Sequence, residues 1–135
     1  MSKGPPVVAV FNSNDDTVEL IRAWFERVGI VVVSAHIDDI KRDGFDLPSF
    51  VDQHKPAAVV FDIAPPYDRS WLFVQHLLSS TPLSRVPAVF TTTNEQHVRE
   101  AAGPVDIIEI VGKPYDLDLL LDKVQAVTGI REREA

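Results

Sequence analysis

Short apolar runs rich in valine and isoleucine alternate along the chain with longer segments whose apolar residues recur every three or four positions. Runs of the first kind are typical of strands that are buried on both faces of a parallel sheet. Polar residues, glycines and prolines bound each run and limit its length. The pattern predicts five strands. Four of them are at Val7–Phe11, Ala57–Phe61, Val86–Thr91 and Ile107–Val111, and the other begins with Ile30–Val33.

The segments between these runs have the periodicity of amphipathic helices. Five helical segments are predicted: Thr17–Val28, Asp46–His54, Asp68 to Ser79 or Ser80, Asn94 to Gly103, and a last helix from Asp116. Asp16 is expected to cap the first helix, with Glu19 at the spacing of a capping box. Asp68, Asn94 and Asp116 are expected to cap later helices, because their side-chain oxygens accept hydrogen bonds from unpaired backbone N–H groups.

The alternation of strands and helices over 135 residues predicts a doubly wound α/β fold. Consecutive parallel strands need right-handed crossover connections, and these place helices on both faces of the sheet. No repeat, low-complexity tract or linker interrupts the order. We therefore expect residues 1–135 to form a single domain, with no output domain in this chain.

Polar residues follow four of the predicted strands at the points where the strands end. Asp62 comes directly after Ala57–Phe61, and Pro65 and Pro66 prevent the strand from continuing. In open α/β sheets, ligands bind beyond the carboxyl ends of the strands, so these loops should meet at one edge. The other loops at this edge are Asn12–Asp16, Thr91–Asn94 and Gly112–Tyr115.

Together the four loops supply a carboxylate, hydroxyl groups and an ammonium group. A carboxylate can act as a nucleophile, and phosphoryl transfer needs donors and positive charge around the equatorial oxygens. Asp62 is therefore the candidate phosphoacceptor, with Thr92 and Lys113 as candidate contacts to the phosphoryl group. Taken singly, Asp62 is equally well explained as a turn residue, and Thr92 as a strand residue selected for packing.

The chain resembles the receiver domain of two-component response regulators over nearly its full length, through Asp62–Pro66, Pro87–Thr93 and Lys113–Asp116. The resemblance implies a flavodoxin-like (βα)5 three-layer sandwich with a parallel sheet of order 2-1-3-4-5. It implies that Asp62 accepts a phosphoryl group from a histidine kinase or a phosphotransfer protein, and that Thr92 and Lys113 contact this group. It also implies a cis peptide bond between Lys113 and Pro114. Such a domain is a phosphoacceptor that switches a protein-interaction surface, and is not an enzyme beyond self-phosphorylation and autodephosphorylation.

One departure from the receiver pattern affects metal binding. Receivers carry a pair of acidic residues after the first strand that helps to hold Mg²⁺, and Asn12 and Ser13 stand at these positions. Because Mg²⁺ often uses only one or two carboxylates, a weak site is expected from Asp62, the Ala64 carbonyl, Asn12 and Ser13. The nearby Asp15 and Asp16 are interpreted as capping residues of the first helix.

A second departure leaves other functions open. Ile110 stands where many receivers have an aromatic residue that moves with the threonine on phosphorylation. With the missing acidic pair, it motivates a second hypothesis, a pseudo-receiver that binds a protein partner independently of phosphorylation. A third hypothesis is a flavodoxin-like binder of a nucleotide or flavin. None of the six glycines forms a G-x-G-x-x-G or Walker loop after a strand, which disfavours this third hypothesis.

Composition limits the partners and the compartment. The net charge of −7 opposes binding to nucleic acid or to anionic lipid. The chain has no cysteine, which fits a reducing compartment, and it lacks a signal-peptide pattern and an apolar run of membrane-spanning length. A cytoplasmic protein is expected, with a kinase or phosphotransfer protein and a downstream protein as partners. The sequence leaves a homodimer open, and its four histidines lack the spacing of a metal site.

Overall fold

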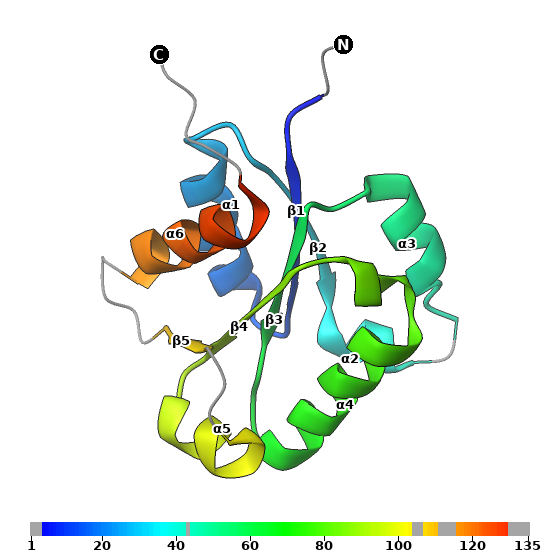
Figure 1. The fold of residues 1–135 in the computed structure, drawn as a ribbon, viewed down its shortest axis with the longest axis vertical. Helices are drawn as coiled ribbons and strands as arrows, with labels where there is room; N and C mark the ends of the chain where they lie inside the picture. Colours follow the sequence, from blue (N-terminus) through cyan, green and yellow to red (C-terminus); the bar gives the residue numbers. More distant parts are fainter. Residues whose placement is uncertain (1–3, 43, 104–106, 111–115, 130–135) are drawn as a thin grey trace.

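The computed structural model describes residues 4–42, 44–103, 107–110 and 116–129. In this part of the chain one parallel sheet is formed by β1 (Val7–Asn12), β2 (Val31–His36), β3 (Ala58–Asp62), β4 (Ala88–Thr92) and β5 (Ile107–Glu109). The strands lie in the order β2-β1-β3-β4-β5, with helices on both faces of the sheet (Figure 1). The structure therefore confirms the predicted doubly wound, flavodoxin-like fold.

The central strands β1 and β3 are the most deeply buried, as their unbroken valine-rich runs predict. Residues 8–12 and 58–61 are all buried, since helices cover both sides of these strands. In the parallel register Phe11 lies beside Phe61, and Asp62 lies beside Thr91. The register therefore brings the ends of β3 and β4 level with each other, at the edge where the candidate site was expected.

One face of the sheet is covered by α1 (Asp15–Glu26) and α6 (Asp116–Thr128). The apolar positions of both helices face the sheet, and Ile21, Phe25 and Leu120 are completely buried there. Trp24 also joins the two helices, because its indole Nε1 donates a hydrogen bond of 2.9 Å to Asp118. The Arg27 guanidinium lies 4.1 Å from the centre of the Trp24 ring and 3.8 Å from the same carboxylate.

The other face is covered by α3 (Leu47–His54), α4 (Tyr67–Ser80), the 3-10 helix η1 (Pro82–Arg85) and α5 (Glu95–Ala102). The core on this side contains the aromatic pair Phe11 and Phe61, whose ring centres are 4.8 Å apart. Phe50 of α3 packs against Phe11 at 5.6 Å. Trp71 of α4 meets Phe90 of β4 edge to face at 5.2 Å. Aromatic packing therefore holds α3 and α4 against the sheet.

The first helix begins earlier than predicted. Asn14 caps α1, because its side chain accepts a hydrogen bond of 3.0 Å from the Thr17 amide. The interpretation of Asp15 and Asp16 as caps is therefore wrong. Both residues stand in the first helical turn, where their negative charge complements the helix dipole. Asn and Asp are nearly equal as capping residues, so composition could not select among three consecutive candidates.

A short helix that was not predicted, α2 (Ile37–Lys41), follows β2. The His36 side chain caps it by accepting a hydrogen bond of 3.2 Å from the Asp38 amide. Ile37 and Ile40 are partly buried against the core of that face. The helix has five residues and stands in a polar stretch, so it is too short to show helical periodicity.

The remaining helices agree with the predicted segments, with some differences at their starts. Asp46 caps α3 and Asn94 caps α5, as predicted. The predicted cap of α4 at Asp68 is wrong, because this helix already begins at Tyr67, after Pro66. The last helix, α6, includes Asp116 as its first residue.

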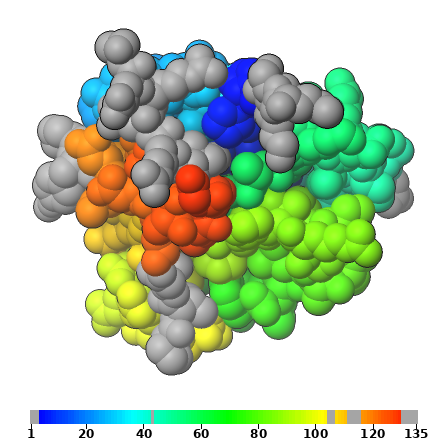
Figure 2. All heavy atoms as spheres, turned by 45° about the horizontal axis from the view of Figure 1, so that its top comes forward, coloured from blue at the N-terminus to red at the C-terminus, as the bar shows by residue number. Residues whose placement is uncertain are grey.

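Helix α6 lies at the surface near α1 in the space-filling view of Figure 2, where it is coloured orange to red. Its Leu119 side chain is 50% exposed, whereas Leu120 next to it is completely buried. The helix is thus amphipathic, with one face on the sheet and one in solvent. Within the described ranges, no helix combines the length and apolar character that a membrane crossing requires.

Candidate functional site

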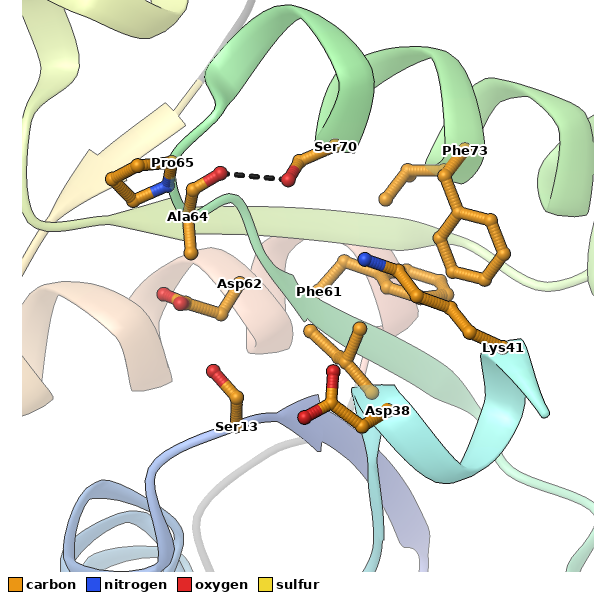
Figure 3. Close-up of a pocket in the computed structure, with 11 residues that line it drawn as sticks. Ser13, Asp38, Lys41, Phe61, Asp62, Ala64, Pro65, Ser70 and Phe73 are labelled. Atoms are coloured by element: carbon orange, nitrogen blue, oxygen red, sulfur yellow. Dashed lines mark hydrogen bonds between the residues drawn. The ribbon is translucent and has the colours of Figure 1, made fainter.

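A small pocket opens where β3 ends, between the loop after β1, the short helix α2 and the start of α4 (Figure 3). Its volume is about 90 Å³, enough for a phosphoryl group or a few water molecules. The polar side chains that line it are those of Ser13, Asp38, Lys41, Asp62 and Ser70. The pocket therefore lies at the strand edge predicted for the site, with Asp62 in its wall.

Asp62 is half-buried at the last position of β3. The Thr91 hydroxyl donates a hydrogen bond of 3.0 Å to its Oδ1 atom, as expected for neighbours in the register of β3 and β4. Burial raises the pKa of the Asp62 carboxyl above its ordinary value, and the hydrogen bond from Thr91 offsets part of this rise. A carboxyl with a raised pKa in a pocket is a candidate for chemistry, since a more basic carboxylate is a better nucleophile.

Replacing Thr91 by valine is expected to raise the pKa of Asp62 further. The substitution keeps the shape of the buried side chain but removes the hydroxyl that stabilises the carboxylate. The chemical shift of the Asp62 carboxyl carbon, followed by NMR through a pH titration, should then change at a higher pH than in the wild type. Thr93→Val is the matched control, because Thr93 is exposed. An unchanged or lowered titration midpoint in Thr91→Val would contradict this account of Asp62.

Thr92, the predicted phosphoryl contact, is completely buried at the end of β4. Its hydroxyl donates a hydrogen bond of 2.8 Å to the Ile63 carbonyl and accepts one of 3.2 Å from the Asn94 amide. The structure thus brings Thr92 beside the end of β3, but the hydroxyl bonded to Asp62 belongs to Thr91. Contact between Thr92 and a phosphoryl group requires its hydroxyl to leave the Ile63 carbonyl, and this role stays a prediction.

Asn12 and Ser13 lie differently although they are adjacent in the sequence. Asn12 is buried, and its Oδ1 atom accepts a hydrogen bond of 2.8 Å from the Asn14 amide. Asn12 therefore orders the loop that leads into α1. Ser13 is exposed and lines the pocket, with its side chain on the same side as Asp62 in Figure 3.

The loop between β3 and α4 forms the upper wall of the pocket in Figure 3. The Ala64 carbonyl accepts a hydrogen bond of 2.6 Å from the Ser70 hydroxyl, which ties the loop to the first turns of α4. The following peptide bond between Pro65 and Pro66 is cis. Ala64 thus lies beside Asp62, as predicted, but its carbonyl oxygen already has a partner.

The predicted ligand set fits Mg²⁺ poorly. Asp62 is its only carboxylate, Ser13 offers a neutral hydroxyl, and the oxygens of Asn12 and Ala64 each already accept a hydrogen bond. Mg²⁺ demands near-ideal octahedral geometry from hard oxygen ligands. Over the described ranges, no group of three or more histidine, aspartate or glutamate side chains is placed to hold a metal ion. The weak metal site therefore remains a prediction.

The double variant Asn12→Asp with Ser13→Asp is expected to bind Mg²⁺ more tightly than the wild type. It adds two carboxylates at the loop beside Asp62, and ligand charge strongly tunes the affinity for divalent cations, so a gain of about tenfold or more is expected. Titration calorimetry would measure the affinity. Asp16→Asn is the control, because Asp16 is exposed in α1 and should not affect binding. Equal affinity in the double variant and the wild type would contradict the assignment of positions 12 and 13 to the metal site.

Two predicted features of the segment after β5 have different outcomes. Lys113 and its bond to Pro114 lie outside the described residues, so the predicted role of Lys113 and the cis bond stay predictions. Ile110 is described, and it packs against the core on the side of α1 and α6. Its amide donates a hydrogen bond of 2.8 Å to the Thr92 carbonyl. Ile110 is therefore linked to Thr92 through the backbone, and its aliphatic side chain is partly buried against the core.

Sequence reasoning missed four polar residues of the site, namely Thr91, Asp38, Lys41 and Ser70. The pairing of β3 with β4 places Thr91 directly beside Asp62, but this register is a property of the folded sheet that the sequence pattern does not give. Asp38 and Lys41 gave no signal, because they reach the pocket from α2, a helix that the pattern does not show.

Comparisons with known proteins support the fold. Neither the protein-family models nor the curated proteins include a match to this chain. Among solved structures, a response regulator receiver protein from Burkholderia phymatum matches with a TM-score of 0.66 and 25% identity, covering 96% of this chain and 99% of that one. A response regulator from Thermotoga maritima matches with a TM-score of 0.65 and 20% identity, covering 93% and 99%.

The chemotaxis response regulator CheY4 of Vibrio cholerae is also similar, with a TM-score of 0.62 and 15% identity over 89% of this chain and 98% of that one. Each of these matches spans nearly the whole of both chains. The predicted resemblance to response regulator receiver domains is therefore confirmed, and what is shared at these identities is the fold. The chemistry of Asp62 has to be argued from the pocket itself.

Proposed function

We propose that this chain is a signal receiver of a two-component phosphorelay. Asp62 accepts a phosphoryl group from a histidine kinase or a phosphotransfer protein, and the modified domain presents a changed surface to a protein partner. The observation that carries the proposal is Asp62, a half-buried carboxyl of raised pKa in the wall of a pocket of phosphoryl size. The receiver-like fold agrees with a signalling domain and not with a conventional enzyme.

The proposed reaction is a phosphoryl transfer between two side chains. A carboxylate oxygen of Asp62 attacks the phosphorus, and a P–O bond forms as the bond from phosphorus to the donor histidine nitrogen breaks. The nitrogen keeps the electron pair and takes up a proton. The product is an acyl phosphate, whose additional negative charge must be balanced inside the pocket.

The described residues supply parts of this chemistry. Thr91 holds the Asp62 carboxylate by its hydrogen bond, and Ser70 holds the loop that carries Ala64. Thr92 is a candidate contact to the phosphoryl oxygens if its hydroxyl leaves the Ile63 carbonyl. Lys113 is proposed as a cation that pairs with the phosphoryl group, on the strength of the resemblance alone.

A small phosphodonor provides the test. Incubation of the chain with phosphoramidate, in Mg²⁺ or in EDTA, should add one phosphoryl mass in an intact mass spectrum. Borohydride reduces an acyl phosphate to an alcohol, so peptide mapping should then find homoserine at position 62. The absence of an adduct under every metal condition, or an adduct at another residue, would refute the proposal.

A second function, the pseudo-receiver, is favoured by two specific observations. The acidic pair is replaced by Asn12, which bonds to its own loop, and by the neutral Ser13. Ile110 is aliphatic and partly buried against the core, so it cannot act as an aromatic switch residue. In a pseudo-receiver the same fold binds a protein partner with no contribution from phosphorylation. This alternative predicts that substitution of Asp62 leaves partner binding unchanged.

A further inference from the structure

The short helix α2 brings a cation to the pocket beside Asp62. Of the described residues that line this pocket, Lys41 is the one with a positive charge. Figure 3 shows its side chain extending from α2 across the pocket, with the ammonium turned inward between Phe61 and Phe73. The Nζ atom lies 5.3 Å from the centre of the Phe73 ring, within the range of a cation–π interaction. The Phe73 ring therefore helps to hold the ammonium over the pocket.

The ammonium of Lys41 is available for a ligand. None of the described carboxylates forms an ion pair with it, although Asp38 stands one helical turn earlier and lines the same pocket. The Asp38 carboxylate is instead 3.8 Å from the ring nitrogen of His36. A lysine ammonium on a flexible four-carbon stem is a mobile point charge with three donors, which suits the oxygens of a phosphoryl group.

The charge in the pocket shows why such a cation matters. Phosphorylation replaces the single negative charge of Asp62 by about two, in a site where the carboxylate is already half-buried. The predicted metal ligands supply a single carboxylate, so they hold Mg²⁺ poorly. Positive charge has to come from side chains, and among the described residues Lys41 is positioned to supply it.

We propose, on the basis of the proposed function, that Lys41 is a phosphoryl-binding residue of the Asp62 pocket and supplies charge that Mg²⁺ supplies in receivers with an acidic pair. The ammonium contacts the oxygens of the incoming phosphoryl group and stays with them in the acyl phosphate. Phosphorylation of Asp62 then depends strongly on Lys41 and only weakly on the metal.

The test compares rates of phosphorylation by phosphoramidate in the wild type, Lys41→Met, Lys41→Arg and Lys55→Met, each in Mg²⁺ and in EDTA. Lys55 is the matched control, since it is exposed at the end of α3 and pairs with Asp52 at 3.8 Å, away from the pocket. Lys41→Met should slow the reaction by about tenfold or more, because it removes a charged donor from the transferring group. Lys41→Arg should keep most of the rate, and Lys55→Met should match the wild type.

Three results would overturn the inference, and they are distinguishable. A rate in Lys41→Met equal to that of the wild type would remove Lys41 from the site while leaving phosphorylation of Asp62 intact. A strict requirement of the wild type for Mg²⁺ would show that a metal, for instance one held between Asp38 and Asp62, supplies the charge. A wild type that takes up no phosphoryl group in either condition would refute the proposed function, and the role of Lys41 with it. Circular dichroism of the variants, whose substitutions are on exposed residues, checks that each is folded.

Discussion

The variant Asp62→Ala is expected to take up no phosphoryl group from a small donor, whereas the wild-type chain is expected to take up one. This result is expected because the substitution removes the only carboxylate that β3 delivers to the pocket. The measurement is the intact mass after phosphodonor treatment. An adduct that persists in Asp62→Ala would show that another side chain is modified and would contradict the assignment of Asp62.

The isosteric variant Asp62→Asn separates loss of the nucleophile from loss of the fold. The asparagine oxygen can still accept the hydrogen bond from Thr91, so the native structure should be retained. Burial raises the pKa of Asp62 in the folded chain above its value in the unfolded chain, so the folded chain holds this proton more tightly. Its contribution to stability is therefore present below the ordinary aspartate pKa of 3.8 and is lost as the pH rises through the folded value.

A pH series of urea unfolding checks this sign. At neutral pH the wild type carries a half-buried charge that Asp62→Asn lacks, so the variant should be at least as stable as the wild type. As the pH falls from neutral toward 3.8, the free energy of unfolding of the wild type should rise relative to that of the variant, because the Asp62 carboxyl becomes protonated. A wild type that loses stability relative to Asp62→Asn over this interval would show that the pKa of Asp62 is lowered by folding.

The same variants distinguish a receiver from a pseudo-receiver once a partner is identified. In a receiver whose output depends on phosphorylation, the phosphodonor changes the affinity of the wild type for its partner and leaves that of Asp62→Asn unchanged. In a pseudo-receiver, both proteins bind the partner equally, with or without the donor. The two proteins differ at one non-hydrogen atom of one side chain, so the comparison is not affected by differences in folding.

The second large effect is on stability, and it concerns the aromatic core beneath the pocket. Phe11→Ala is expected to lower the free energy of unfolding by about 3–5 kcal/mol, the usual cost of removing a buried phenyl ring. Phe11 is completely buried and contacts the rings of both Phe61 and Phe50, so the cavity cannot be filled by a small movement. Urea unfolding followed by circular dichroism would measure the loss.

Leu72→Ala serves as the control for this measurement. Leu72 is 68% exposed on α4, so its truncation should change the free energy of unfolding by no more than about 0.5 kcal/mol. If Phe11→Ala cost as little as Leu72→Ala, the placement of Phe11 between the sheet and α3 would be wrong.

The positions of the strands and of the longer helices along the chain could be predicted because each carries a pattern over several residues, whereas the order 2-1-3-4-5 within the sheet is implied by the resemblance to receiver domains. The runs Val8–Phe11 and Ala58–Phe61 are apolar throughout, and only a doubly covered parallel sheet buries both faces of such strands. The cap of α1 could not be predicted, since Asn14, Asp15 and Asp16 are almost equal in capping propensity. The short helix α2 escaped detection because two partly buried isoleucines do not make a period.

In the candidate site, too, some residues could be predicted from the sequence and others could not. Asp62 could be predicted, because its position at the end of a buried run depends only on the local sequence. The hydroxyl that contacts it could not be chosen between Thr91 and Thr92, since adjacent residues of a strand point to opposite faces and only the register decides. The place of Lys41 in the pocket depends on how the polar stretch after β2 folds into α2, which is a property of the assembled fold.

The placement of the two tryptophans makes the two halves of the core separately observable. Trp24 lies between α1 and α6 on one side of the sheet, and Trp71 packs on Phe90 on the other side. Since the chain has two tryptophans, replacing either by phenylalanine leaves a single fluorophore on a known face. Each single-tryptophan protein would then report on one layer of helices. Comparing their emission during unfolding or partner binding would show which layer moves first.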